Sequence, residues 1–164
     1  MAVLQMPRGN LETVCPRALV LAAIAEALDQ RRYAEAWRLA ILNRVDLNLL
    51  VDYRWPSILP EMAAFARAVP RPVDLCDLLF ALGPGSIIEP GGIYASILVG
   101  GAEDCISGAD GVGAAGAVLP GSDKVDIVCD ALREAVEQLP GGRSKYLTVV
   151  ATAYARCVSA FHAW

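Results

Sequence analysis

The sequence is poor in the residues that metal centres and nucleophilic active sites use most. Histidine occurs once, as His162, and the five cysteines are scattered without a C-x-x-C pair (Cys15, Cys76, Cys105, Cys129 and Cys157). Metal-ligand spacing is absent, and the spacing supports no serine or cysteine paired with a histidine base. An odd, dispersed set of cysteines favours buried free thiols in a reducing compartment over a disulfide framework. We therefore expect no catalytic residue, no metal ligand and no cofactor.

Long apolar runs and an excess of positive charge are also missing. The formal net charge is −4, and the basic residues are scattered, with Arg31 and Arg32 as the closest pair. Autonomous nucleic-acid binding requires a basic face, so none is expected. The apolar run at residues 18–25 is far shorter than the ~18 residues of a membrane span. It ends in small residues, as a signal peptide does, but Glu12 and Pro16 precede it and the helical pattern continues to Leu28. The sequence predicts a soluble protein.

Apolar residues, 55% of the chain, recur mainly at the spacing of amphipathic helices. The predicted helices cover residues 17–29, 33–41, 47–52, 60–69, 72–82, 122–139 and 145–161. Asp46 is expected to cap the third helix and Ser144 the seventh. The seventh helix is predicted to bury one stripe, which consists of Leu147, Val150, Ala151, Tyr154, Val158 and Phe161. The first five helices begin about 13–16 residues apart, which is typical of helix-hairpin repeats.

Two segments lack the helical pattern. Residues 1–6 alternate weakly before the turn residues Pro7, Arg8, Gly9 and Asn10, and they are read as one short strand. Residues 84–121 are rich in glycine and alanine and are read as a flexible insertion, in which residues 93–99 could form a short strand or helix. The predicted class is all-α, an α-solenoid of tetratricopeptide-like helical hairpins, divided at residues 1–12, 13–83, 84–121 and 122–164. Because neither end has a polar cap, we expect a segment of something longer.

The sharpest apparent motif is G-x-G-x-x-G at Gly111, Gly113 and Gly116. A dinucleotide site needs a strand before these glycines and a helix after them. No strand pattern precedes them, and Pro120 ends any helix almost at once, so a nucleotide-binding enzyme is a remote alternative. The carboxylate pairs Glu103/Asp104 and Asp123/Asp126 are read as solvated surface and helix N-terminal charge.

Four stretches together resemble one known family. They are LQMPRGNLE at residues 4–12, RALVL at 17–21, RVDLNLL at 44–50 with Asp52, and DKVDIVCDALR at 123–133. Their order and spelling resemble the largest subunit of the Elongator complex, the IKAP family, where the second β-propeller gives way to a helical solenoid. The family-motif residues, all expected to have structural roles, are Pro7, Arg8, Gly9, Asn10, Arg17, Leu47, Asn48, Asp52, Asp126, Cys129 and Asp130.

The resemblance implies a non-catalytic scaffold of a complex whose separate catalytic subunit modifies wobble uridine (U34) of tRNA. It implies other Elongator subunits as partners, tRNA contact only through the full complex, and a cytoplasmic location that can extend to the nucleus. Residues 1–6 would be the last strand of a propeller, and Pro7 to Asn10 the exit turn into the solenoid. Homodimerisation and direct tRNA binding are not expected of this chain. The alternative is a free-standing helical interaction module of another pathway.

Overall fold

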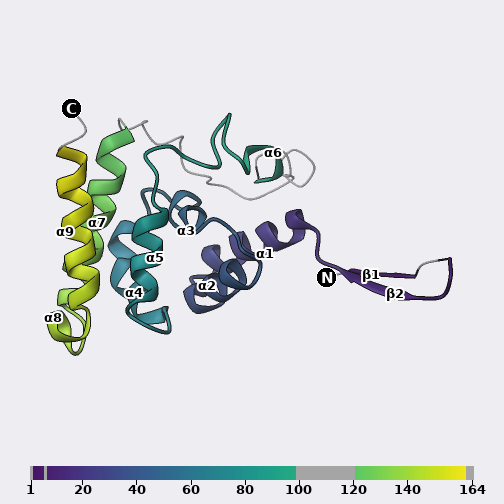
Figure 1. Ribbon diagram of the computed structural model, residues 1–164, viewed down its shortest axis with the longest axis horizontal. Helices are drawn as coiled ribbons and strands as arrows, with labels where there is room; N and C mark the ends of the chain where they lie inside the picture. The colour runs from purple at the N-terminus through teal and green to yellow at the C-terminus, as the bar shows by residue number, and fades with distance from the viewer. Residues whose placement is uncertain (1, 6, 99–120, 162–164) are drawn as a thin grey trace.

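The computed structural model describes residues 2–5, 7–98 and 121–161, and these are mostly helical (Figure 1). The predicted all-α, solenoid-type class is confirmed. In chain order the elements are β1 (Ala2–Gln5), β2 (Leu11–Val14), α1 (Arg17–Asp29), α2 (Tyr33–Leu42), α3 (Asn48–Asp52), the 3₁₀ helix η1 (Leu59–Glu61), α4 (Met62–Ala68), α5 (Asp74–Ala81), α6 (Ala95–Leu98), α7 (Gly121–Glu137), α8 (Gly142–Lys145) and α9 (Leu147–Phe161).

Neighbouring helices pack in succession, as in a solenoid. α1 packs on α2, α2 on α4, and the pair α7 and α9 covers α4 and α5 (Figure 1). Phe65 of α4 packs against two aromatic side chains of α2. Its ring makes edge-to-face contacts with Tyr33 and Trp37, with 5.6 Å and 6.2 Å between the ring centroids. Such pairs add to the free energy of burial that already holds the helices together. The leucine stripe expected in the helix at residues 72–82 is buried (Leu75, Leu78, Leu79 and Leu82), whereas Ile41, expected on the buried stripe of the second helix, is 50% exposed.

The first two helices end in the same way, with an arginine in the left-handed region. Arg31 has φ 57° and Arg44 has φ 51°. The next residue in each case donates its backbone N–H back to the helix, Arg32 to the carbonyl of Ala27 at 2.7 Å and Val45 to that of Ala40 at 2.9 Å. These bonds satisfy carbonyls that the helix end would otherwise leave open, which offsets the cost of a left-handed non-glycine residue.

The N-terminal segment differs from the prediction of one strand and an exit turn. Residues 2–14 form an antiparallel hairpin that pairs Ala2 with Val14 and Gln5 with Leu11, and it points away from the helices (Figure 1). The four residues from Pro7 to Asn10 are the turn of this hairpin, and Gly9 supplies the positive φ of 85°. The exit-turn assignment is therefore wrong, and β2 crosses the predicted boundary between residues 12 and 13.

The first part of the predicted flexible insertion is packed. Tyr94 is buried, and its backbone N–H donates to the carbonyl of Ile87 at 2.9 Å. Any side chain at Gly92 would collide with the backbone of Ile87, so glycine here permits a close approach. Residues 95–98 form α6, so the segment at 93–99, which could have been a strand or a helix, contains a helix.

The G-x-G-x-x-G stretch with Gly111, Gly113 and Gly116 lies outside the described residues, as do Glu103, Asp104, Cys105 and His162.

The buried face of α9 also differs from the prediction. Leu147 is 64% exposed and Tyr154 is half exposed, whereas Val149 and Ala153 are buried together with the predicted Val150. Ser144 lies inside α8 and is not the cap of α9. The alanine-rich helix offers two adjacent apolar stripes. The packing of α9 on α5 and α7 buries the stripe that contains Val149 and Ala153 and not the predicted one.

Among the residues that the structure describes, every helix falls short of the length or the apolarity that crossing a lipid bilayer requires.

Candidate functional site

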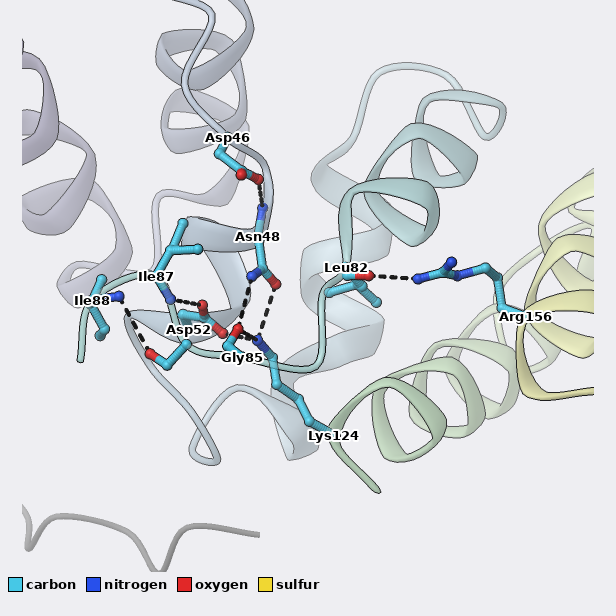
Figure 2. A network of polar contacts seen from close by, with 10 residues as sticks. Asp46, Asn48, Asp52, Leu82, Gly85, Ile87, Ile88, Lys124 and Arg156 are labelled. Carbon is cyan, nitrogen blue, oxygen red and sulfur yellow. Dashed lines mark hydrogen bonds and ion pairs between the residues drawn. The ribbon is translucent and has the colours of Figure 1, made fainter. Parts of the chain in front are cut away.

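Three buried polar side chains meet where the N-terminal and C-terminal parts of the helical body join. Asn48 and Asp52 come from α3, and Lys124 comes from the first turn of α7 (Figure 2). Asn48 is 2% exposed, and the side chains of Lys124 and Asp52 are 8% and 1% exposed. We call Asn48, Asp52, Lys124 and the carbonyl of Gly85 the Lys124 cluster. Burial of so many polar groups is costly unless each finds a partner.

The ammonium group of Lys124 is fully used by its neighbours. It forms an ion pair with Oδ1 of Asp52, and it donates to Oδ1 of Asn48 at 3.1 Å and to the carbonyl of Gly85 at 3.2 Å. A lysine ammonium has three N–H donors, so these three acceptors match its capacity. The cluster thus satisfies the lysine charge inside the protein.

The acceptors are held from the other side by backbone groups. The second carboxylate oxygen of Asp52 accepts the backbone N–H of Ile87 at 2.9 Å, and Nδ2 of Asn48 reaches the carbonyl of Gly85 at 3.4 Å. Burial raises the pKa of Asp52 above its ordinary value, while the hydrogen bonds and charge of Lys124 oppose the rise. Asp46 was predicted to cap α3; the N-cap position is Leu47, and Asp46, one residue earlier, accepts the backbone N–H of Asn48 at 2.9 Å.

Local sequence explains how these groups come together. Asn48 and Asp52 are four residues apart, which places both on one face of α3. α5 ends before Gly83, and the chain then passes α3 with the Gly85 carbonyl beside the same face. A lysine in the first turn of a helix opposes the helix dipole, so the position of Lys124 requires a compensating anion, and Asp52 supplies it.

This arrangement favours holding helices together over catalysis. A lysine that acts as a nucleophile must lose its proton and reach a substrate, but Lys124 is buried and paired with a carboxylate. The cluster joins α3, the segment after α5, and α7, which lie far apart in the sequence. Among the described residues no group of three His, Cys, Asp or Glu side chains could hold a metal ion.

A second polar contact ties the start of α1 to distant backbone. Arg17 donates to the carbonyls of Asn43 at 2.7 Å and Arg44 at 3.1 Å, and to the hydroxyl of Tyr94 at 3.0 Å. The guanidinium also lies 5.7 Å from the centre of the Tyr94 ring. Arg17 therefore satisfies carbonyls at the end of α2 and anchors the segment that carries α6.

The family-motif residues of α7 are Asp126, Cys129 and Asp130, and their surroundings differ. Cys129 is buried, and its thiol interacts with that of Cys157; burial raises the pKa of the Cys129 thiol to about 12, and Cys157 adds to the rise. A thiol with such a pKa is protonated at neutral pH and is a poor nucleophile. Asp130 forms an exposed ion pair with Arg133 at 3.2 Å. One oxygen of Asp126 is buried without a hydrogen-bond partner among the described residues.

The structure thus brings together only part of the predicted set. Asn48 and Asp52 share one cluster. Leu47, which directly precedes Asn48 in the sequence, is also buried. The hairpin-turn residues, from Pro7 to Asn10, are exposed and lie apart from the cluster. Lys124 is not among the predicted site residues, although it lies within one of the family-like stretches. Its signal in the sequence is a lysine at the start of a helix, where a positive charge is unfavourable.

The fold and the cluster define a class of protein: a mostly helical solenoid segment whose buried polar groups secure the packing of its helices. Residues 17–97 match the family model described as the ELP1 alpha-solenoid. The Elongator complex protein 1 of Schizosaccharomyces pombe is 32% identical over 133 residues, which cover 80% of this chain and 9% of the relative. The Elongator complex protein 1 of Saccharomyces cerevisiae is 30% identical over 165 residues, which cover 93% of this chain and 12% of the relative. The Elongator complex protein 1 of Drosophila melanogaster is 36% identical over 94 residues, which cover 57% of this chain and 7% of the relative.

The chain belongs to the Elongator complex protein 1 family. It spans about a tenth of the length of these curated relatives. The family resemblance seen in the four sequence stretches is thereby confirmed.

Proposed function

We propose that this chain acts as a non-catalytic scaffold segment of an Elongator complex and supports the modification of wobble uridine 34 in tRNA. The observation that carries the proposal is the match of residues 17–97 to the ELP1 alpha-solenoid, because those residues form the N-terminal part of the helical body described above, from α1 into α6. A scaffold needs rigid, reproducible placement of its helices. The Lys124 cluster and the contacts of Arg17 supply it.

The chemistry of the buried groups supports a role without catalysis. The Lys124 ammonium is paired and enclosed, and the Cys129 thiol has a raised pKa. Each of these groups has a sufficient structural explanation, since it contacts a neighbouring helix or backbone carbonyl. None of them needs a substrate to account for its position.

The partners we propose are other Elongator subunits. With a formal net charge of −4, the chain has no electrostatic excess that would draw it to RNA by itself, so tRNA contact is assigned to the full complex. A cytoplasmic location, with access to the nucleus, follows from the same proposal. Homodimerisation is not assigned to this segment.

A chimera tests the proposal in a full-length protein. The matching segment of Saccharomyces cerevisiae Elongator complex protein 1 is replaced by this chain, and the tagged chimera is expressed in cells that lack the native protein. We expect the other Elongator subunits to co-purify in near-native amounts, measured by quantitative mass spectrometry. The modified wobble uridines of tRNA, measured in nucleoside digests, are expected to persist.

A matched control separates scaffold function from mere presence of the segment. The same chimera with Lys124→Met is expected to assemble less well, and Lys145→Met, which changes an exposed lysine, is expected to behave as the parent. A chimera that accumulates to normal levels but recovers no Elongator subunit would contradict the proposal. Recovery of an unrelated set of partners instead would support the free-standing interaction module.

A further inference from the structure

We propose that Cys129 and Cys157 form a redox-active pair, which a small disulfide such as oxidised glutathione converts reversibly into a disulfide bond between α7 and α9. Both residues are free thiols in the structure. Because each comes from a different helix, a bond between them fixes the two helices relative to each other. The proposal concerns this helix pair alone and does not depend on membership in an Elongator complex.

The packing of α7 on α9 brings the two sulfur atoms together. The helices lie side by side, and the Cys129 thiol donates a hydrogen bond to the sulfur of Cys157 (Figure 1). Cys129 is fully buried, and so is Ala153, which precedes Cys157 by one turn on the same face of α9. Small side chains at these positions allow the helices to approach closely. A disulfide requires such an approach, since its two Cβ atoms lie about 3.8 Å apart.

The other cysteines that the structure describes have different surroundings. Cys15 is exposed and directly follows β2, whereas Cys76 of α5 is buried, with its sulfur 3.6 Å from the hydroxyl oxygen of Thr152. These two cysteines serve as internal references for the pair. Modification of Cys15 shows that the oxidant is active, and the state of Cys76 shows whether burial alone protects a thiol.

The exposure of the two thiols sets the order of the chemical steps. Cys157 is partly exposed, so its thiolate attacks one sulfur of oxidised glutathione and expels the other half as reduced glutathione. The sulfur of Cys129 then attacks the sulfur of Cys157 in this mixed disulfide and expels the second glutathione. Two protein thiols are thereby oxidised and one glutathione disulfide is reduced. The two thiol protons end on the two released glutathione molecules.

Oxidation of the pair is expected to be slow. Burial raises the pKa of both thiols, that of Cys129 to about 12, so few thiolates are present at neutral pH. The second step is nevertheless favoured, because the two sulfurs are already in contact and the attack is intramolecular. The pair therefore responds to a sustained change in the ratio of disulfide to thiol around the protein, rather than to a brief one.

The experiment incubates the full chain with excess oxidised glutathione, once in its folded state and once in concentrated urea. Remaining thiols are blocked with iodoacetamide, and the tryptic peptides are identified by mass spectrometry. In the folded chain we expect one main linkage, between the peptides of residues 125–133 and 157–164, while Cys76 remains a free thiol and Cys15 acquires glutathione. Urea is expected to remove this selectivity, and excess reduced glutathione to reverse the linkage.

Two variants and one thermal measurement complete the test. Cys129→Ser is expected to leave Cys157 as a mixed disulfide with glutathione, whereas Cys76→Ser should not change the linkage. The disulfide closes a loop of roughly 30 residues and should raise the Tm of the chain by about 5–10 °C. A folded chain in which Cys15 carries glutathione but Cys129 and Cys157 stay unlinked would overturn the proposal. Equal selectivity in urea would also overturn it, as would a lower Tm after oxidation.

Discussion

Replacing Lys124 by methionine tests the central physical claim about this molecule, which is that one buried ion pair joins its two helical parts. Methionine has a similar length and fills much of the same space, but it leaves the carboxylate of Asp52 without its counter-charge. Since the Asp52 side chain is 1% exposed, water cannot replace the lost ammonium. Asn48 and the Gly85 carbonyl each lose a charged donor as well.

The magnitude follows from these losses. Removal of one partner from a buried pair typically costs about 3–5 kcal/mol, and each hydrogen bond to a charged group contributes about 1.5–3 kcal/mol. We take about 4 kcal/mol as the expected decrease in the free energy of unfolding. For a chain of this size, that corresponds to a decrease in Tm of about 8–16 °C.

Urea denaturation followed by circular dichroism at 222 nm and by tryptophan fluorescence is the assay. Coincident transitions in both signals justify a two-state analysis. Removing both charges, with Lys124→Met and Asp52→Leu together, should cost less than Lys124→Met alone, because no unpaired charge remains buried. A loss below about 1 kcal/mol in Lys124→Met, or a double variant less stable than it, would refute the reasoning.

Three further perturbations test other parts of the structure. Val149→Ala should lower the free energy of unfolding by about 2 kcal/mol, whereas Leu147→Ala should change it by less than about 0.5 kcal/mol, as measured by urea denaturation. Burial raises the pKa of Tyr33 to about 12 from an ordinary value of 10.0, aided by its hydrogen bond to Glu61. The folded state therefore holds this proton more tightly, so stability should fall as pH rises from 10 to 12, and thermal melts of Tyr33→Phe should show a smaller fall. Arg17→Met should cost about 1–3 kcal/mol and speed amide hydrogen exchange near the end of α2.

The helices were predictable where a single apolar stripe left no choice. The spacing of Leu75, Leu78, Leu79 and Leu82 admits one buried face, and the proline and glycine residues around it fix its ends. α9 was harder because alanines separate two adjacent stripes, so that Leu147 and Val149 both satisfy the helical period. The choice between them depends on α5 and α7, which no local pattern contains.

The N-terminal hairpin was missed for a related reason. The segment Leu11–Val14 alternates for only four residues, and an isolated pair of short strands is marginally stable in water. The turn between the strands was nevertheless visible in the sequence, since Gly9 stands where a positive φ is needed. What the sequence lacked was evidence that the chain continues beyond the turn as a second strand.

The Lys124 cluster shows most clearly what local reasoning leaves out. The stretches that contain Asn48 and Lys124 were each recognisable, but nothing in either stretch says that they meet, because 76 residues separate the two side chains that form this bond. A lysine in the first turn of a helix is locally unfavourable, and an aspartate inside a helical body is unfavourable without a partner. The two residues are compatible with a stable fold only when they lie together as an ion pair. In this chain, two charges at poor local positions therefore mark a pair that is distant in the sequence.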